Sequence, residues 1–265
     1  GKRGRLARTR AGASGRRPVA RARKALASCP AGWQLADTAA KAERMRPRPG
    51  TPRTAARLVD AVWARRVAAE LDHAGLPAAE FLREAGLRRE RLAGPDARVP
   101  FVAHVALLEA AARALEEPCF GMRLGAAVEL AETGLVGYLA LSSRDLREAL
   151  RNLCRYLALQ TEGAVGELRE EAGEARLLFS PADPAGAASR QLADFAAARI
   201  VRHLAALTGR RVRPVRLELR HEPACPALAR RLGLPVAAHQ PHNAVVLDVG
   251  SLALPVVEAD ARLLA

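Results

Sequence analysis

The sequence predicts an α+β fold, in which a helical first half is followed by a small, mostly antiparallel sheet with helices packed against it. Between residues 54 and 163, apolar residues recur every three or four positions, which is typical of amphipathic helices. From residue 164 onward, short stretches alternate apolar and polar residues, as half-buried strands do. Because the helical segments precede the strands instead of alternating with them, the pattern favours α+β over α/β.

Charge separates the first part of the chain from the remainder. Residues 1–53 contain 15 Lys and Arg against 2 acidic residues, a net charge of +13, whereas the remainder has 27 basic and 26 acidic residues. The basic segment is rich in Arg, Ala, Gly and Pro without periodicity, so residues 1–53 are expected to be a disordered extension. We expect one domain over 54–265, with a helical part (54–163) and a sheet-containing part (164–250). Its near-neutral charge gives no electrostatic footprint for DNA.

Cysteine usage and hydropathy indicate a soluble cytoplasmic protein. The four cysteines, Cys29, Cys119, Cys154 and Cys225, form no CxxC pair, which fits a reducing compartment better than a disulfide framework. Cys119 and Cys154 are therefore expected to be small buried apolar residues. No run of eighteen apolar residues and no signal peptide is visible, so no membrane-spanning helix is expected.

Helix start and stop signals place the elements of the first half. Thr54 is suited to cap a helix that ends at Gly75, and Pro77 and Gly86 bracket a short second helix. Residues 92–100 contain Gly-Pro-Asp and predict a turn. The remaining helices expected here cover residues 101–115 and residues 118–125.

The clearest helix signal follows Ser142 and Ser143, which are good N-cap residues. Asp145 places a carboxylate in the first turn, where the helix dipole favours negative charge. Leucines then form one apolar stripe, at Leu146, Leu150, Leu153 and Leu157.

The second half has the period of strands. Residues 165–171 and 174–180 flank Ala172-Gly173 and predict a hairpin. A long helix is expected over residues 188–208. The other elements expected are a strand at 215–220, a short helix at 224–232, and short strands at 236–238 and 244–247.

Residues with catalytic or metal-binding chemistry form no convincing set. His239 and His242 are three apart, but they lie in a Pro-containing loop without a third ligand nearby, which indicates a solvated loop and not a metal site. No lysine follows Lys41, which excludes Schiff-base and P-loop mechanisms from the folded region. We therefore expect no enzyme activity, no cofactor and no metal.

Four polar residues are candidates for a small-molecule pocket, because such pockets are mostly apolar with a few placed polar groups. Tyr138 and Tyr156 flank the central helix, and Gln160 follows Tyr156 by four residues. His203 lies in the long helix. The alternative for the tyrosines is packing with the hydroxyl in solvent, and for His203 a helix-face or core position.

Several ordered segments together resemble the effector-binding N-terminal domain of AraC/XylS-type transcriptional regulators, specifically those related to ornithine-utilisation activators. The resemblance covers roughly residues 57–260. Its central match is Gly134-Leu135-Val136-Gly137-Tyr138, followed by Leu141-Ser142-Ser143, Glu148-Ala149-Leu150 and Arg155-Tyr156; flanking matches are residues 75–76, 86–87, 92–100, 120–125, 215–221 and 243–248.

The resemblance implies a domain that binds a small organic effector, is compatible with a homodimer, and acts on DNA only through a C-terminal helix-turn-helix domain. That DNA-binding domain is not found here, since the sequence stops at Ala265, where it would begin. Two alternatives stay open. A stand-alone nucleic-acid binder would lose salt-sensitive DNA binding when residues 1–53 are deleted. A small-molecule enzyme would show turnover in residues 54–265 that is lost on mutation of Cys154 or His203.

Overall fold

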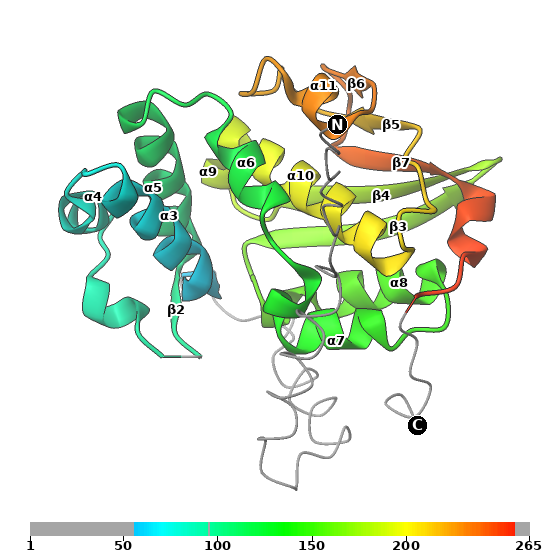
Figure 1. Cartoon of the computed structure of the whole chain (residues 1–265), viewed down its shortest axis with the longest axis horizontal. Helices are drawn as coiled ribbons and strands as arrows, with labels where there is room; N and C mark the ends of the chain where they lie inside the picture. Colours follow the sequence, from blue (N-terminus) through cyan, green and yellow to red (C-terminus); the bar gives the residue numbers. More distant parts are fainter. Residues whose placement is uncertain (1–55, 95, 258–265) are drawn as a thin grey trace, which may run out of the picture.

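The computed structural model describes residues 56–94 and 96–257 (Figure 1). It confirms the α+β class: the first three α-helices of the described residues form a separate helical part, and the five-stranded sheet lies beside them with further helices packed against it. The predicted basic extension over residues 1–53 lies outside the described residues, so the nucleic-acid alternative that relies on it stays a prediction. Among the described residues, no helix is long and apolar enough to cross a membrane.

The first predicted helix begins later than its pattern suggested. Residues Leu58–Asp60 form strand β1, which pairs antiparallel with β2, Arg98–Pro100. Helix α3, Ala61–His73, follows, and the Asp60 side chain caps it by accepting a hydrogen bond from the Val62 amide at 2.9 Å. The predicted cap at Thr54 was therefore wrong, because pairing of two three-residue strands overrides the helical periodicity there.

The remaining helices of the first half agree with the sequence. They are α4 (Ala78–Glu84), α5 (Phe101–Ala114) and α6 (Phe120–Ala126), with a 3-10 turn, η1, at Arg89–Leu92. Helices α3, α4 and α5 pack around one apolar cluster that contains Trp63, Leu71 and Leu108. This cluster is the core of the helical part.

The central helix, α8, covers Leu146–Tyr156, and its N-cap is Asp145 instead of either serine. The Asp145 carboxylate accepts a hydrogen bond from the Glu148 amide at 2.9 Å. Ser142 ends the preceding helix α7, Leu135–Leu141, and the Ser143 hydroxyl donates to the Leu139 carbonyl at 2.8 Å. The serines thus finish one helix, and Asp145 starts the next. Two 3-10 turns flank this helix pair, η2 at Leu130–Thr133 and η3 at Leu157–Leu159.

The sheet has the strand order β3-β4-β7-β5-β6, and only the β5–β6 pair is parallel. The predicted hairpin is confirmed, with β3 paired to β4 in register around Ala172-Gly173. The bounds are β3 Ala164–Glu171, β4 Glu174–Pro181, β5 Arg216–Glu218, β6 Val236–Ala237 and β7 Ala244–Asp248; the intervening helices are α9 Pro184–Ala188, α10 Arg190–Leu207 and α11 Leu228–Leu232, and the 3-10 turn η4 covers Val249–Ala253.

The two faces of the sheet differ. Pairing places Leu168, Leu177, Val245 and Leu217 in one row across four strands, and three of these belong to the apolar cluster shared with α8 and α10. The opposite face carries Arg176 and Arg216, which form ion pairs with Glu171, Glu174 and Glu218. Helices therefore cover one face, as the sequence predicted.

Helix α10 belongs to both apolar clusters. Phe195 lies in the cluster of the helical part, whereas Ala197, Leu204 and Leu207 lie in the cluster beneath the sheet. The helix runs across the sheet and meets α6 (Figure 1). It is the element that joins the two cores.

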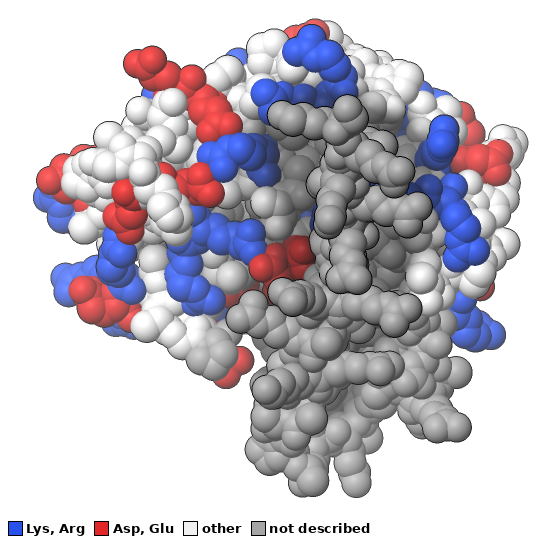
Figure 2. Space-filling view, viewed as in Figure 1, with Lys and Arg blue, Asp and Glu red and all other residues white. Residues whose placement is uncertain are grey.

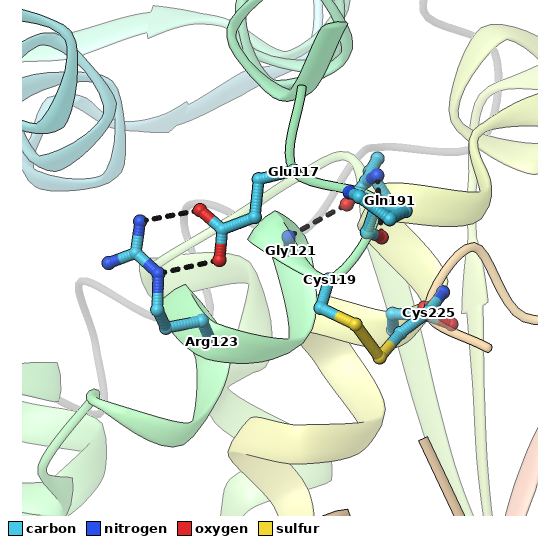
Figure 3. Close-up of a disulfide and its surroundings, with 8 residues drawn as sticks. Glu117, Cys119, Gly121, Arg123, Gln191 and Cys225 are labelled. Atoms are coloured by element: carbon cyan, nitrogen blue, oxygen red, sulfur yellow. Dashed lines mark hydrogen bonds and ion pairs between the residues drawn. A yellow bond between two sulfur atoms is a disulfide. The ribbon is translucent and has the colours of Figure 1, made fainter. Parts of the chain in front are cut away.

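Helices α6 and α10 approach each other closely because two glycines face the contact. A Cβ atom at Gly121 would lie 2.1 Å from the Gln191 carbonyl oxygen, and one at Gly125 would lie 2.1 Å from the Phe195 carbonyl oxygen. The Gly121 amide also donates to Gln191 Oε1 at 2.7 Å (Figure 3). The two backbones are thus in contact, with no room for a side chain between them.

A disulfide between Cys119 and Cys225 lies beside this helix contact (Figure 3). It joins the start of α6 to the segment before α11. The expectation that Cys119 is an unpaired apolar residue was therefore wrong, because the fold brings together two cysteines that are 106 positions apart in sequence. Cys154 is the free thiol among the described cysteines.

Charged side chains of both signs are interspersed on the described parts of the face that Figure 2 shows. Many of them are paired, for example Arg147 and Arg151 with Glu170, and Arg123 with Glu70 and Glu117. This arrangement agrees with the near-neutral charge of the folded region.

Replacement of Gly125 tests the helix contact. Gly125→Ala should lower the free energy of unfolding by about 2–3 kcal/mol, because the added methyl group forces two backbones apart. Urea denaturation monitored by circular dichroism measures this loss. Ala126→Ser, at the exposed neighbouring position of the same helix, is the control and should change stability by less than about 0.5 kcal/mol. Equal stability of both variants would contradict the close approach.

Reduction tests the disulfide. Dithiothreitol should lower the stability of the wild-type protein by about 2–4 kcal/mol, because the bond closes a long loop and restricts the unfolded chain. Cys225→Ala should show a similar loss without reductant and no further loss with it. A wild-type protein whose unfolding midpoint does not respond to dithiothreitol would contradict the bond.

Candidate functional site

A cavity of about 130 Å³ lies where the two apolar clusters meet. The helical part contributes Trp63 of α3 and Phe101 of α5, and the sheet part contributes Leu177 and Phe179 of β4. Helix α8 adds the end of its leucine stripe, Leu153, and Leu157 follows in the adjoining turn. The wall is thus mainly apolar and is built by elements from both halves of the domain.

Helix α10 supplies one continuous side of the cavity. Leu192, Ala196, Arg199 and His203 all line it, and their spacing of three or four residues places them on one helix face. The face changes from apolar to polar along its length. The polar end of the wall is therefore held on a long helix that is anchored in both cores.

Arg199 is the charged residue of the wall. Its guanidinium carbon lies 5.6 Å from the ring centroid of Trp63 and 5.6 Å from that of Phe195. These two rings meet edge to face, with centroids 5.7 Å apart. Burial lowers the pKa of Arg199 to about 10, so the side chain is still a cation at neutral pH. It makes no hydrogen bond or ion pair through its side chain with residues 56–94 or 96–257.

Two buried histidines accompany Arg199 on the cavity wall. Burial, together with the charge of Arg199, lowers the pKa of His104 to about 4 and that of His203 to about 3. Both rings are therefore neutral at pH 7. His104 Nδ1 and His203 Nε2 lack hydrogen-bond partners within the described part of the chain. His203 also hydrogen-bonds the backbone of Val128, which leaves Nε2 as the nitrogen available to the cavity.

The structure brings two of the four predicted site residues to this cavity. Gln160 and His203 line it, and Gln160 Nε2 donates to the Thr133 carbonyl at 2.7 Å. Tyr138 on α7 and Tyr156 at the end of α8 are not among the lining residues. Tyr156 instead packs against Arg155, whose guanidinium carbon lies 5.5 Å from its ring centroid. The two tyrosines were suggested by their positions beside α8, but neither of them lines this cavity.

Sequence reasoning missed Arg199, Trp63 and His104. Arg199 was one of many arginines, and net charge alone did not distinguish it. The signal that was available is its position in the apolar stripe of α10, where a cation requires an explanation. His104 similarly lies on the buried face of α5, where an ionisable ring requires an explanation.

Other groups near the cavity show no catalytic arrangement. Burial and the negative charge of Glu167 raise the pKa of Cys154 to about 11, so its thiol is protonated at neutral pH. In the described ranges, no three His, Cys, Asp or Glu side chains are placed to hold a metal ion. The loop histidine His239 is exposed and pairs with Glu222 at 3.2 Å.

The buried histidines predict sensitivity to acid. Their pKa values are lower in the folded state than the usual 6.5, so the unfolded chain binds more protons below pH 6.5 and stability falls as pH falls toward 4. The loss is about 1.4 kcal/mol per pH unit for each histidine in that window. Asp194 acts in the opposite direction, because burial raises its pKa to about 7. The urea unfolding midpoints of the wild type and of the double variant His104→Gln/His203→Gln, taken between pH 4.5 and 7, measure how much of the loss of stability in acid comes from the two histidines.

The double variant should lose clearly less stability on acidification than the wild type. Asp194→Asn is the control of opposite sign and should steepen the wild-type loss. Parallel pH profiles for the wild type and the double variant would show that the two rings are not buried in the neutral form.

Comparison with known proteins connects this architecture to regulators. Residues 75–256 match the family described as the arabinose-binding domain of AraC transcription regulators, N-terminal. An ornithine utilization regulator from Pseudomonas aeruginosa is 31% identical over 147 residues, which cover 56% of this chain and 43% of that protein. The chain thus spans less than half the length of this curated relative.

A solved structure supports the fold. The transcriptional regulator CdpR from Pseudomonas aeruginosa superposes with a TM-score of 0.53 at 17% sequence identity, covering 76% of this chain and 59% of that one. The family match extends from the end of α3 to the residues after η4 and includes most elements that line the cavity. The chain belongs to the family of N-terminal, arabinose-binding-type domains of AraC transcription regulators.

Proposed function

We propose that this domain senses a small organic effector in the cavity between its two cores and thereby controls a helix-turn-helix DNA-binding module. The observation that carries the proposal is the cavity itself, which is apolar in most of its wall and contains Arg199 and two neutral histidines at one end. Binding sites for small molecules have this composition. Membership of a regulator family supports the same function.

The position of the cavity suggests how an effector acts. A ligand there contacts Trp63 and Phe101 from the helical part and Leu177 and Phe179 from the sheet part. It therefore stabilises whichever arrangement of the two parts closes around it. An effector changes DNA affinity only when it binds one arrangement more tightly than the other, and a site between two cores provides such a difference.

Location and oligomeric state belong to the proposal as well. A regulator of transcription acts where the DNA is, so we place the protein in the cytoplasm, although a disulfide such as Cys119–Cys225 is rare in that compartment. A homodimer stays a prediction, which light scattering after size-exclusion chromatography checks.

A variant that fills the cavity tests the proposed site. Ala196 lines it on α10, and Ala196→Leu should place three more carbon atoms in the empty volume. We expect the variant to fold with unchanged or higher stability and to lose effector binding, since the ligand needs that volume. Thermal shift with a library of organic acids, amines, amides, alcohols and sugars first identifies a ligand of the wild type. At a free concentration of a hundred times its Kd, this ligand should raise the free energy of unfolding by about 2.7 kcal/mol.

Ala206→Leu is the matched control, since Ala206 is exposed on the same helix away from the cavity. It should bind the ligand as the wild type does. Equal binding by Ala196→Leu and Ala206→Leu would place the ligand elsewhere. A complete absence of ligands in the library would contradict the sensing function.

A further inference from the structure

Arg199 differs from the other arginines that are buried or half-buried in this domain. Arg98 pairs with Glu162, Arg123 with Glu70 and Glu117, and Arg216 with Glu174 and Glu218. Arg199 has only the faces of Trp63 and Phe195 against it in the described structure. Placing a cation in an apolar wall without an anion is unfavourable, so we expect this residue to lower the stability of the ligand-free domain.

The protein groups around Arg199 do not supply the missing negative charge. The charge of Arg199 lowers the pKa of both His104 and His203, which shows that these rings are its electrostatic neighbours. Neutral imidazoles offer no anion. No carboxylate is among the residues that line the cavity. An anionic ligand would therefore give Arg199 the counter-charge that residues 56–94 and 96–257 do not supply.

We infer that the effector is a small carboxylate whose carboxyl group pairs with Arg199 and whose apolar body fills the cavity between α8, α10 and β4. This inference rests on the proposed function and narrows the class of effector. A planar guanidinium donates two parallel hydrogen bonds to a carboxylate, and the aromatic faces hold the guanidinium in place for that contact. The rest of the wall, including Leu157, Phe179 and Ile200, suits carbon atoms.

The volume of the cavity and the unpaired nitrogen of His203 narrow the class of effector further. The volume of about 130 Å³ is close to that of a cavity of about 150 Å³ that accepts benzene, so the effector has a compact body of about six to eight non-hydrogen atoms. His203 bonds the Val128 backbone through one nitrogen, and its unpaired Nε2 then accepts a hydrogen bond. A hydroxyl or amino group on the acid would satisfy this nitrogen and add affinity.

Matched pairs of ligands test the inference on the full chain. The probes are carboxylic acids of about four to eight carbon atoms, linear, aromatic, hydroxy- and amino-substituted, each compared with its primary amide by isothermal titration calorimetry. The amide keeps the shape and removes the charge. We expect at least one acid to bind more than about 30-fold tighter than its amide, which corresponds to the strength of a charge-assisted, bidentate contact.

Substitution of the arginine provides the second arm. Arg199→Met should abolish the preference for the acid over its amide, and Arg199→Lys should retain part of it, since a lysine keeps the charge but not the two parallel donors. Arg202→Met is the matched control on the same helix, because Arg202 does not line the cavity. Its guanidinium instead faces Glu129, with a nitrogen-to-oxygen distance of 4.0 Å. It should keep the preference of the wild type.

Stability separates a binding role from a structural one. Without ligand, Arg199→Met should unfold at the same temperature as the wild type or a higher one, because it removes an unpaired cation. A lower melting temperature would mean that Arg199 supports the fold through its ring contacts, and would overturn the inference.

The ligand results also separate this inference from the proposed function. Amides or other neutral compounds that bind as tightly as acids, and are excluded by Ala196→Leu, would overturn the carboxylate assignment but leave the sensing site intact. Acids whose preference survives in Arg199→Met would overturn it as well. Failure of every probe, charged or neutral, would count against both.

Discussion

The contact between α6 and α10 is the constraint on which the rest of the domain depends. Gly121 and Gly125 let the two backbones meet, and this contact fixes α10 at the boundary between the helical core and the core beneath the sheet. The disulfide at Cys119 and the Gln191 hydrogen bond hold the same region. Since α10 carries one whole side of the cavity, any displacement of this helix changes the shape of the site.

The proposed function rests on where the cavity lies. A pocket inside one core would be filled by side chains for stability alone, whereas this one is lined by elements of both cores and contains a cation that no anion of the described residues pairs with. The domain thus gives up some stability to keep a polar end in an apolar cavity. That balance is typical of binding sites, where local unfavourable interactions are relieved when the ligand arrives.

Much of the fold was predictable because periodicity and turn residues act locally. The hairpin around Ala172-Gly173, the long helix that includes His203, and the α+β order all follow from such patterns. The β1–β2 pair was not predictable, because three-residue strands leave almost no periodic signal and depend on a partner 40 residues away. The disulfide depends likewise on tertiary contact between distant segments. The N-cap of α8 was assigned to the wrong residue, because Ser142 and Ser143 interact with the end of the preceding helix and Asp145 is left to cap α8.

The lining of the candidate cavity was partly predictable for a similar reason. Gln160 and His203 were identified as polar groups beside apolar stripes, whereas the tyrosines met the same criterion and lie elsewhere. Arg199 required knowledge that no acidic side chain within the described part of the chain pairs with it, and sequence alone does not give that. The ion pairs of Arg98, Arg123 and Arg216 join residues that are distant in sequence or depend on the fold, so the lack of such a pair at Arg199 within the described residues emerges only in the folded molecule.

The most direct measurement is a crystal structure of the domain grown with its best-binding compound. The account predicts electron density for the ligand between α10, α8 and β4, in contact with side chains of both cores and with the Arg199 guanidinium. Density for the compound at any other surface, with the cavity unchanged from the ligand-free protein, would contradict it.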